Sequence, residues 1–239
     1  MRNVLLIGLT ALVLSACGGG GSSSGGAPVA PPATAAYSIA ITNLTNAQPL
    51  SPPVAALHQG GFRIFTLGEP AGDGLEELAE GGDSARLRSE AGEADGVIAV
   101  SAFPEVIPPG ATAEVELTVL DEERTGLTLS LATMLVNTND AFSGANRLMG
   151  LGDLAPGDGL MVQAVAYDAG TEADSEGPGT IPGPADGGEG FNAARDDDAD
   201  RVSMHAGVVT ASDGLPTSVL TEAHRFDNPV LRVRVTRVN

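Results

Sequence analysis

The chain has 239 residues with 31 acidic and 12 basic side chains, which gives a formal net charge of −19 at pH 7. Every basic residue is arginine, so chemistry that needs lysine, such as a Schiff base or a phosphate-binding P-loop, is excluded. The acidity also argues against nucleic acid as a partner, because binding to a phosphate backbone requires basic surfaces. It favours cation binding or solubility in a salty medium.

The amino terminus has the pattern of a secreted, lipid-anchored protein. Arg2 is followed by an apolar run over residues 4–14, and small residues precede Cys17, the only cysteine. The apolar run is shorter than the ~20 residues that a membrane span needs. The pattern resembles a bacterial lipoprotein signal. It predicts that residues 1–16 are cleaved and that acyl chains on Cys17 hold the protein on a membrane.

The next segment, residues 17–36, is rich in Gly, Ser, Pro and Ala and predicts a tether. Gly18, rather than an aspartate, follows Cys17, which favours attachment to the outer membrane of the bacterial cell envelope. Without another cysteine, the mature protein has neither an internal disulfide nor a thiolate metal site.

Residues 37–239 predict one all-β domain, an antiparallel β-sandwich with one or two short helices. Apolar and polar residues alternate over 111–120 and again over 231–235, as in half-buried strands. The expected strands are 37–43, 61–67, 97–103, 111–120, 127–136, 160–167, 202–210 and 230–238. Helices are expected over 74–80, with Asp73 as the cap, and over 84–90.

Acidic loops follow two of these expected strands, at residues 137–140 and 167–172. Loops after strands gather at the ends of a sandwich, where oxygens from separate segments can converge on a cation. Ca²⁺ takes ~6–8 oxygen ligands and tolerates irregular geometry. Gly170 permits a tight turn that would bring Asp168 and Glu172 toward one point. The alternative is an Asx turn, in which such acids cap backbone amides and face water.

Four segments together resemble bacterial spondin-domain proteins. They read QPLSPP at 48–53, LGEPA at 67–71, MLVNTNDAF at 134–142 and YDAGTE at 167–172. The last is similar to a segment in the amino-terminal domains of animal F-spondin and mindin. The resemblance implies a C2-like antiparallel β-sandwich that binds calcium and serves extracellular adhesion.

The resemblance also implies a set of calcium ligands. It assigns Asp168 and Glu172, where the animal domains have aspartate at both matching positions. A further ligand is implied within the segment that resembles residues 140–148, for which Asp140 and Asn146 are the candidates. The animal domains carry cysteines in this region and this chain has none, so hydrophobic packing and calcium would have to replace their disulfides.

Other chemical motifs are weaker. The acidic run 195–200 is similar to the start of an EF-hand but lacks the loop glycine and the final glutamate, so a solvated loop is expected. The histidines, His58, His205 and His224, form no zinc-binding motif, and His205 is expected to be packed or hydrogen-bonded. The Gly-x-Ser-x-Gly match at 21–25 lies in the tether and is no nucleophile elbow.

The sequence therefore predicts a non-catalytic, envelope-anchored, calcium-binding adhesion or recognition module. Its partners would be the membrane, through Cys17, and an extracellular or envelope protein or glycan. One alternative is an envelope hydrolase that cleaves polysaccharide with two paired carboxylates. Another is a passive structural lipoprotein without a specific ligand. A recognition module is expected to bind a partner without turnover. A hydrolase is expected to show turnover that depends on two acids, and a passive lipoprotein is expected to show neither property.

Overall fold

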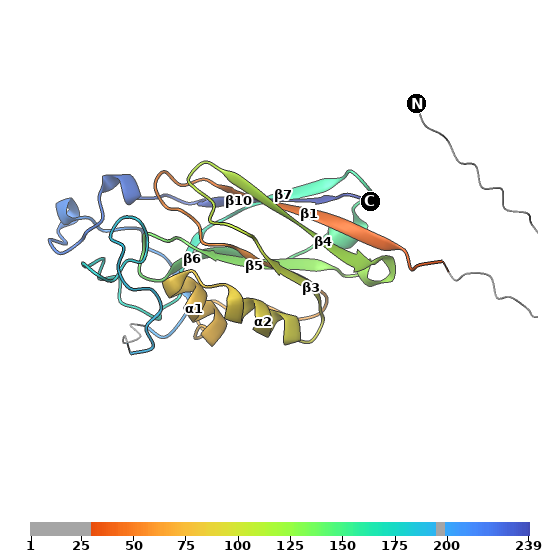
Figure 1. Ribbon diagram of the computed structural model, residues 1–239, viewed down its shortest axis with the longest axis horizontal. Coiled ribbons are helices and arrows are strands. Elements are labelled where there is room, and N and C mark those ends of the chain that lie inside the picture. Colours follow the sequence, from red (N-terminus) through yellow and green to blue (C-terminus); the bar gives the residue numbers. More distant parts are fainter. Residues whose placement is uncertain (1–29, 195–198) are drawn as a thin grey trace, which may run out of the picture. The chain divides into compact units, whose positions relative to one another are not determined.

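The computed structural model describes residues 30–194 and 199–239, and the named strands and helices lie in one compact unit, Pro32–Asn239 (Figure 1). Cys17, the expected signal 1–16 and most of the expected tether lie outside the described residues, as do residues 195–198 of the acidic run. Among the described residues, no helix has the length and apolar character needed to cross a membrane.

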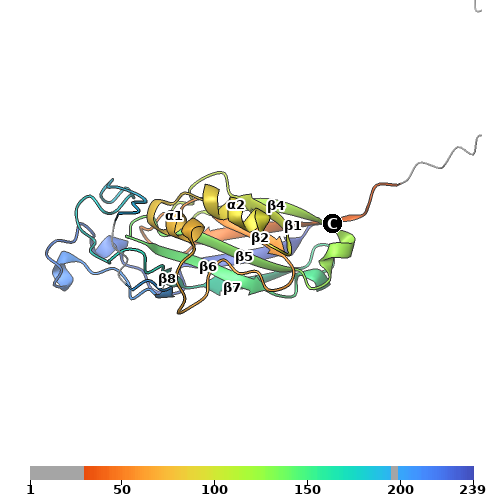
Figure 2. The same ribbon diagram turned by 90° about the horizontal axis from the view of Figure 1, so that it is seen from below.

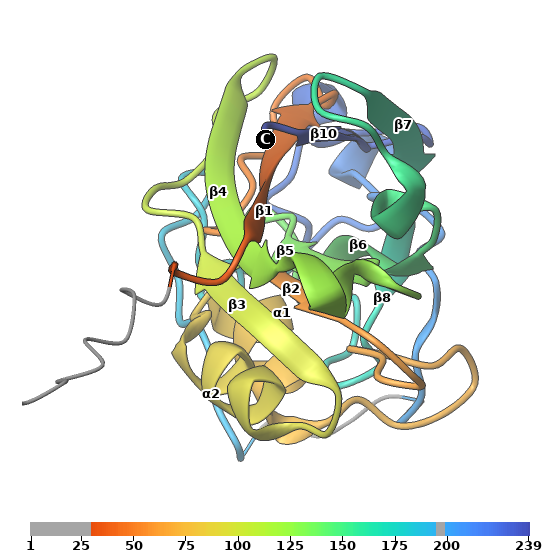
Figure 3. The same cartoon turned by 90° about the vertical axis from the view of Figure 1, so that its right-hand side faces the viewer.

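Within the described residues, two antiparallel sheets face each other (Figure 3). The first has the strand order β4-β1-β10-β7, and the second has the order β3-β2-β5-β6-β8-β9. The strands are β1 (Thr34–Asn43), β2 (Val54–His58), β3 (Val97–Ala102), β4 (Thr112–Leu120), β5 (Thr128–Met134), β6 (Ala141–Leu148), β7 (Gly159–Ala164), β8 (Ala166–Asp168), β9 (Ser203–Met204) and β10 (Leu231–Arg237). This architecture confirms the predicted all-β sandwich.

The main core lies between the sheets and follows from the alternation seen in the sequence. Ile39 and Ile41 of β1 and Val233 of β10 are completely buried, whereas Arg234 between two buried valines is exposed. Successive side chains of a strand point to opposite faces, so alternate residues enter the core. Burial of each such side chain contributes about 1.5–3 kcal/mol, which makes these rows the main stabilising feature of the first sheet.

Two short helices, α1 (Asp73–Gly81) and α2 (Ala85–Glu93), cover the outer face of the second sheet (Figure 2). Leu78 of α1 and Leu87 of α2 belong to a second buried cluster, which also contains Phe142 of β6. Both expected helices are confirmed. Gly72 rather than Asp73 is the N-cap of α1, and Asp73 lies in its first turn.

Residues 61–67, expected to be a strand, form a loop instead. Phe65 of this loop packs against Phe142 and Tyr167, with ring centroids 5.0 and 4.8 Å apart. The side chain of Asn146 donates a hydrogen bond to the Phe65 carbonyl (2.9 Å) and accepts one from the Ile64 amide (2.9 Å). The strand prediction was wrong here because the apolar residues anchor a loop over an aromatic cluster.

The structure also divides or shortens two expected strands. The run 160–167 crosses between the sheets at Val165, so β7 belongs to the first sheet and β8 to the second. Within 202–210 only the two residues of β9 are paired. β2 and β6 were not predicted, since β2 is buried at all five residues and shows no alternation. β6 occupies most of the segment 140–148, in which the resemblance implied a further ligand.

Candidate metal centre

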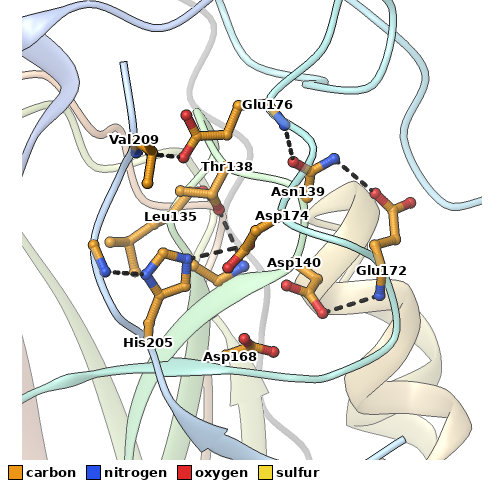
Figure 4. A network of polar contacts seen from close by, with 12 residues as sticks. Leu135, Thr138, Asn139, Asp140, Asp168, Glu172, Asp174, Glu176, His205 and Val209 are labelled. Carbon is orange, nitrogen blue, oxygen red and sulfur yellow. Dashed lines mark hydrogen bonds and ion pairs between the residues drawn. The ribbon is translucent and has the colours of Figure 1, made fainter. Parts of the chain in front are cut away.

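Three carboxylates from separate segments meet at one end of the second sheet (Figure 4). Asp140 directly precedes β6, Asp168 is the last residue of β8, and Asp174 lies in the loop that follows β8. One oxygen atom from each side chain lies within 4.8 Å of the other two. The antiparallel register of β6 and β8 pairs Ala141 with Asp168. Asp140 and Asp168 are therefore neighbours because of the sheet itself.

The side chain of Asp140 is the most constrained of the three. It is 0 % exposed, and its Oδ2 atom accepts hydrogen bonds from the backbone amides of Thr171 (2.8 Å) and Glu172 (3.1 Å). Its Oδ1 atom has no hydrogen-bond partner among the described residues. A buried polar atom left without a partner costs about 1–3 kcal/mol, and more when the group is charged. The arrangement therefore favours a ligand at Oδ1.

The electrostatics of Asp140 point the same way. Burial raises its pKa most, the charge of Asp168 raises it further, and the two backbone hydrogen bonds lower it. The result is a pKa of about 7, compared with an ordinary value of 3.8. Three carboxylates this close repel one another when all are ionised, and a bound cation would remove that repulsion.

Asp168 is held by the turn that the sequence indicated. Its Oδ1 atom accepts a hydrogen bond from the Gly170 amide (2.6 Å), which is an Asx turn. Gly170 has a φ angle of 74°, and a Cβ atom there would lie 2.5 Å from the Arg201 carbonyl oxygen. Only glycine fits this position without strain. The expected Asx turn is therefore present, and the acids that converge with Asp168 are Asp140 and Asp174 rather than Glu172.

His205 lies behind Asp174 and is buried, as the sequence analysis expected. Its Nε2 atom is 3.5 Å from Asp174 Oδ1, and its Nδ1 atom accepts a hydrogen bond from the Gly207 amide (2.9 Å). Because Nδ1 accepts an N–H, the ring proton of the neutral imidazole lies on Nε2, facing Asp174. His205 therefore orients a carboxylate and presents no lone pair to the cluster, which leaves a set of oxygen ligands.

The pKa of His205 reflects these surroundings. Burial lowers it, while the hydrogen bond and the charge of Asp174 raise it by more, so the net shift is upward. Protonation of Nδ1 would set that nitrogen against the Gly207 N–H. The backbone contact therefore decides the tautomer: whenever the ring is neutral, its proton lies on Nε2.

The segment 137–140 holds the loops around the carboxylates. The side chain of Asn137 accepts a hydrogen bond from the Ala185 amide (2.9 Å), and Thr138 accepts one from the amide of Ala141 (3.1 Å). Asn139 accepts one from the Glu176 amide (2.9 Å). Each residue before Asp140 therefore fixes a different part of the loop region, which explains a run of buried polar residues at this position.

Two of the four residues predicted as metal ligands, Asp140 and Asp168, are brought together. Glu172 contributes its backbone amide to Asp140, but its carboxylate accepts a hydrogen bond from the Asn139 side chain (3.1 Å) and points away from the cluster in Figure 4. Asn146 holds the loop at Ile64 and Phe65 and lies outside the three-carboxylate group.

Neither Asp174 as a third carboxylate nor His205 as its partner was predicted from the sequence. Asp174 follows Glu172 by two residues, so the only local signal was a second acid further along the same loop. His205 follows Asp174 by some thirty positions along the chain, and no spacing rule connects them.

No family model matches this chain, and no match to it is found among curated proteins. The resemblance to spondin domains therefore stays a prediction. The fold and the acidic cluster rest on the structure.

Proposed function

We propose that Asp140, Asp168 and Asp174 bind Ca²⁺ and that the ion orders the loops at this end of the sandwich. The observation that carries the proposal is the buried Oδ1 atom of Asp140, which has no hydrogen-bond partner in the described part of the chain and lies in a group with two other carboxylates. Ca²⁺ accepts carboxylate, carbonyl and water oxygens in irregular geometry, so solvent and backbone would complete its ~6–8 ligands.

The choice of calcium over a softer metal follows from the chemistry of the ligands. The chain outside the expected signal has no cysteine except Cys17, and the Nε2 atom of His205 carries a proton toward Asp174. Zinc favours sulfur and nitrogen ligands, whereas hard cations favour oxygen. Of the hard cations, Mg²⁺ demands a near-ideal octahedron, which a cluster drawn from a strand end and two loops suits less well.

The ion would act by joining segments that the sheet does not join. Asp174 belongs to the long loop between β8 and β9, and Glu176 two residues later accepts a hydrogen bond from the Val209 amide (2.8 Å). Neutralising the three carboxylates would thus stabilise the loop before β9 and, through Glu176, the loop after it. These loops would then present a fixed surface for recognition.

We further propose that the module acts without turnover at the bacterial cell envelope, held through Cys17 and engaged in adhesion or recognition of a protein or glycan. The lipoprotein pattern before Cys17 and the resemblance to spondin domains support this role. A general acid of a glycosidase would also need a raised pKa. Asp140 has one, but its side chain is 0 % exposed and out of reach of a polymer.

Calorimetry with calcium tests the site. The full chain carrying Cys17→Ser, which prevents acylation, is stripped with a chelator and titrated beside Asp140→Asn, Asp174→Asn and Asp95→Asn. Asp95 is an exposed acid after α2 and serves as the matched control. Saturable binding is expected in the parent and in the Asp95 variant, and its loss in the other two. Absence of binding at millimolar calcium in the parent would refute the proposal.

A further inference from the structure

The first sheet has an outer face that no described element covers, whereas α1 and α2 cover the second sheet (Figures 1 and 2). We define the outer face by the outward side chains of three neighbouring strands. They are Thr112, Glu114 and Glu116 of β4, Ser38, Ala40 and Thr42 of β1, and Arg232, Arg234 and Thr236 of β10. The middle strand thus offers only small side chains, with charges on either side of it.

The charges on the outer face are separated by sign. Glu114 and Glu116 lie on β4, and Arg232 and Arg234 lie on β10, with β1 between them. Across the sheet, Ala40 is paired with Glu114 on one side and with Arg234 on the other. These three residues therefore form one straight row from an acid, over a methyl group, to a base.

The charges of this row do not neutralise each other within the chain. Neighbouring strands are ~4.8 Å apart, so Glu114 and Arg234 are separated by about twice that distance. Among the described residues neither Arg232 nor Arg234 forms an ion pair. Glu114 instead accepts a hydrogen bond from Ser38 (2.7 Å), which directs its carboxylate toward the middle of the face.

We propose that the outer face is a twofold-symmetric interface with a second copy of this chain. A twofold axis that runs along β1 and passes over Ala40 places β4 of each copy over β10 of the other. In that arrangement Glu114 of each copy faces Arg234 of its partner, so two ion pairs form. The small side chains of Ser38, Ala40 and Thr42 lie at the axis and allow the two sheets to approach closely.

A second copy fits this face better than a partner of one charge. An acidic surface would be repelled by β4, and a basic surface would be repelled by β10. A surface that carries an acidic row and a basic row at the same spacing avoids both repulsions, and the chain itself has such a surface. The local pairing also offers a direct attraction between molecules whose net charge of −19 otherwise keeps them apart. The interface is independent of the proposed calcium site.

Charge reversal tests the interface, with the full chain carrying Cys17→Ser and sedimentation equilibrium as the measurement. The parent is expected to dimerise as its concentration rises. Arg234→Glu and Glu114→Arg are each expected to weaken the dimer more than tenfold, because each change turns two attractive pairs into two repulsive ones. An equimolar mixture of the two variants is expected to form a one-to-one dimer, since both pairs are then restored.

Cross-linking locates the axis. In the Cys17→Ser background, Ala40→Cys is expected to join two chains through a short bismaleimide, because this residue meets its own copy at the axis. Thr118→Cys, on an exposed position of β4, serves as the control and is expected not to do so. A parent that stays monomeric at every concentration overturns the proposal. So does a mixture of the reversed variants that dimerises no better than either one alone, or a dimer that neither reversal weakens.

Discussion

Asp140 shows how a residue can be costly for folding and valuable for binding at the same time. Its Oδ2 atom is satisfied by two backbone amides, while Oδ1 is buried, has two acidic neighbours and forms no hydrogen bond with residues 30–194 or 199–239. Without a cation, the ionised form is disfavoured, which is why its pKa rises to about 7. Binding of Ca²⁺ would reverse that preference.

The raised pKa predicts how the stability of the metal-free protein depends on pH. The folded protein holds this proton more tightly than the unfolded chain, so stability falls as pH rises from about 4 to about 7. At ~1.4 kcal/mol per pKa unit, the loss amounts to about 4 kcal/mol. Urea denaturation in chelator at pH 5 and pH 8 should show about 3 kcal/mol of this loss, because the remainder falls below pH 5, and Asp140→Asn should lack this component. Identical pH dependence in the parent and the variant would contradict the prediction.

His205 is predicted to position Asp174 rather than to bind the metal. His205→Gln keeps an N–H donor and should retain calcium affinity within a few-fold. His205→Leu removes the donor and should weaken binding by ~10–100-fold, the usual range for a residue that supports a metal ligand. Calorimetric titration of both variants separates the two roles. Equal losses in both would show that only the shape of the ring matters.

Two of the four residues that form the candidate site could be predicted from the sequence. Asp140 and Asp168 lie in loops that follow expected strands, and the resemblance to spondin domains selected them as ligands. Asp174 and His205 depend on how a long loop folds back. That path is set by contacts such as the one between Asn139 and the Glu176 amide, and no local pattern encodes it.

Among the elements, the turn after β8 decides whether the cluster can form. Gly170 gives this turn its left-handed conformation and brings the following loop against Asp140, whose Oδ2 accepts hydrogen bonds from the Thr171 and Glu172 amides. The pairing of β6 with β8 fixes one side of the site, and this turn fixes the other.

Gly170→Ala is predicted to destabilise the protein more than a glycine substitution elsewhere with the same backbone strain. The added Cβ would meet the Arg201 backbone at 2.5 Å, in addition to the cost of a φ angle of 74°. Gly157→Ala is the control, because its φ angle is 88° and nothing lies within 4 Å of the added atom. We expect a loss of about 1–2 kcal/mol for the control and ~2 kcal/mol more for Gly170→Ala. Urea denaturation measures both, and equal losses would contradict the clash.

The strands that could be predicted are those with one buried and one exposed face. β1, β4 and β10 alternate because their outer side chains meet water. β2 and the first half of β6 are buried throughout, since the helices cover the outer face of their sheet, and their sequences show no period of two. Period alone cannot identify such strands.

For the whole molecule, calcium is predicted to order the loops and to leave the sheets unchanged. The described residues of the loop between β8 and β9 and of the loop after β9 form a small apolar cluster of Ile181, Val208 and Leu220, apart from the two larger clusters. Limited proteolysis with and without calcium is expected to cut these loops much faster in chelator and to leave the sheets intact. Cleavage at equal rates in both conditions would contradict a role for the ion in ordering them.

The order of strands in the sheets could not be predicted. Alternation indicates that a segment is a strand and which side is buried, but it does not indicate its neighbour. The partner of β1 at the beginning of the described chain is β10 at its end, a pairing that depends on the packing of the complete core.

That pairing governs when the protein can fold during synthesis. β10 (Leu231–Arg237) lies between β1 and β7 in the first sheet, so the sheet has a gap at its centre until these residues have been made. Until then β1 and β7 each have an edge with unpaired backbone groups. Pairing between strands so far apart in the sequence slows folding. A chain that stops before Leu231 lacks Leu231, Val233 and Val235, all completely buried, and is expected to be degraded by proteases.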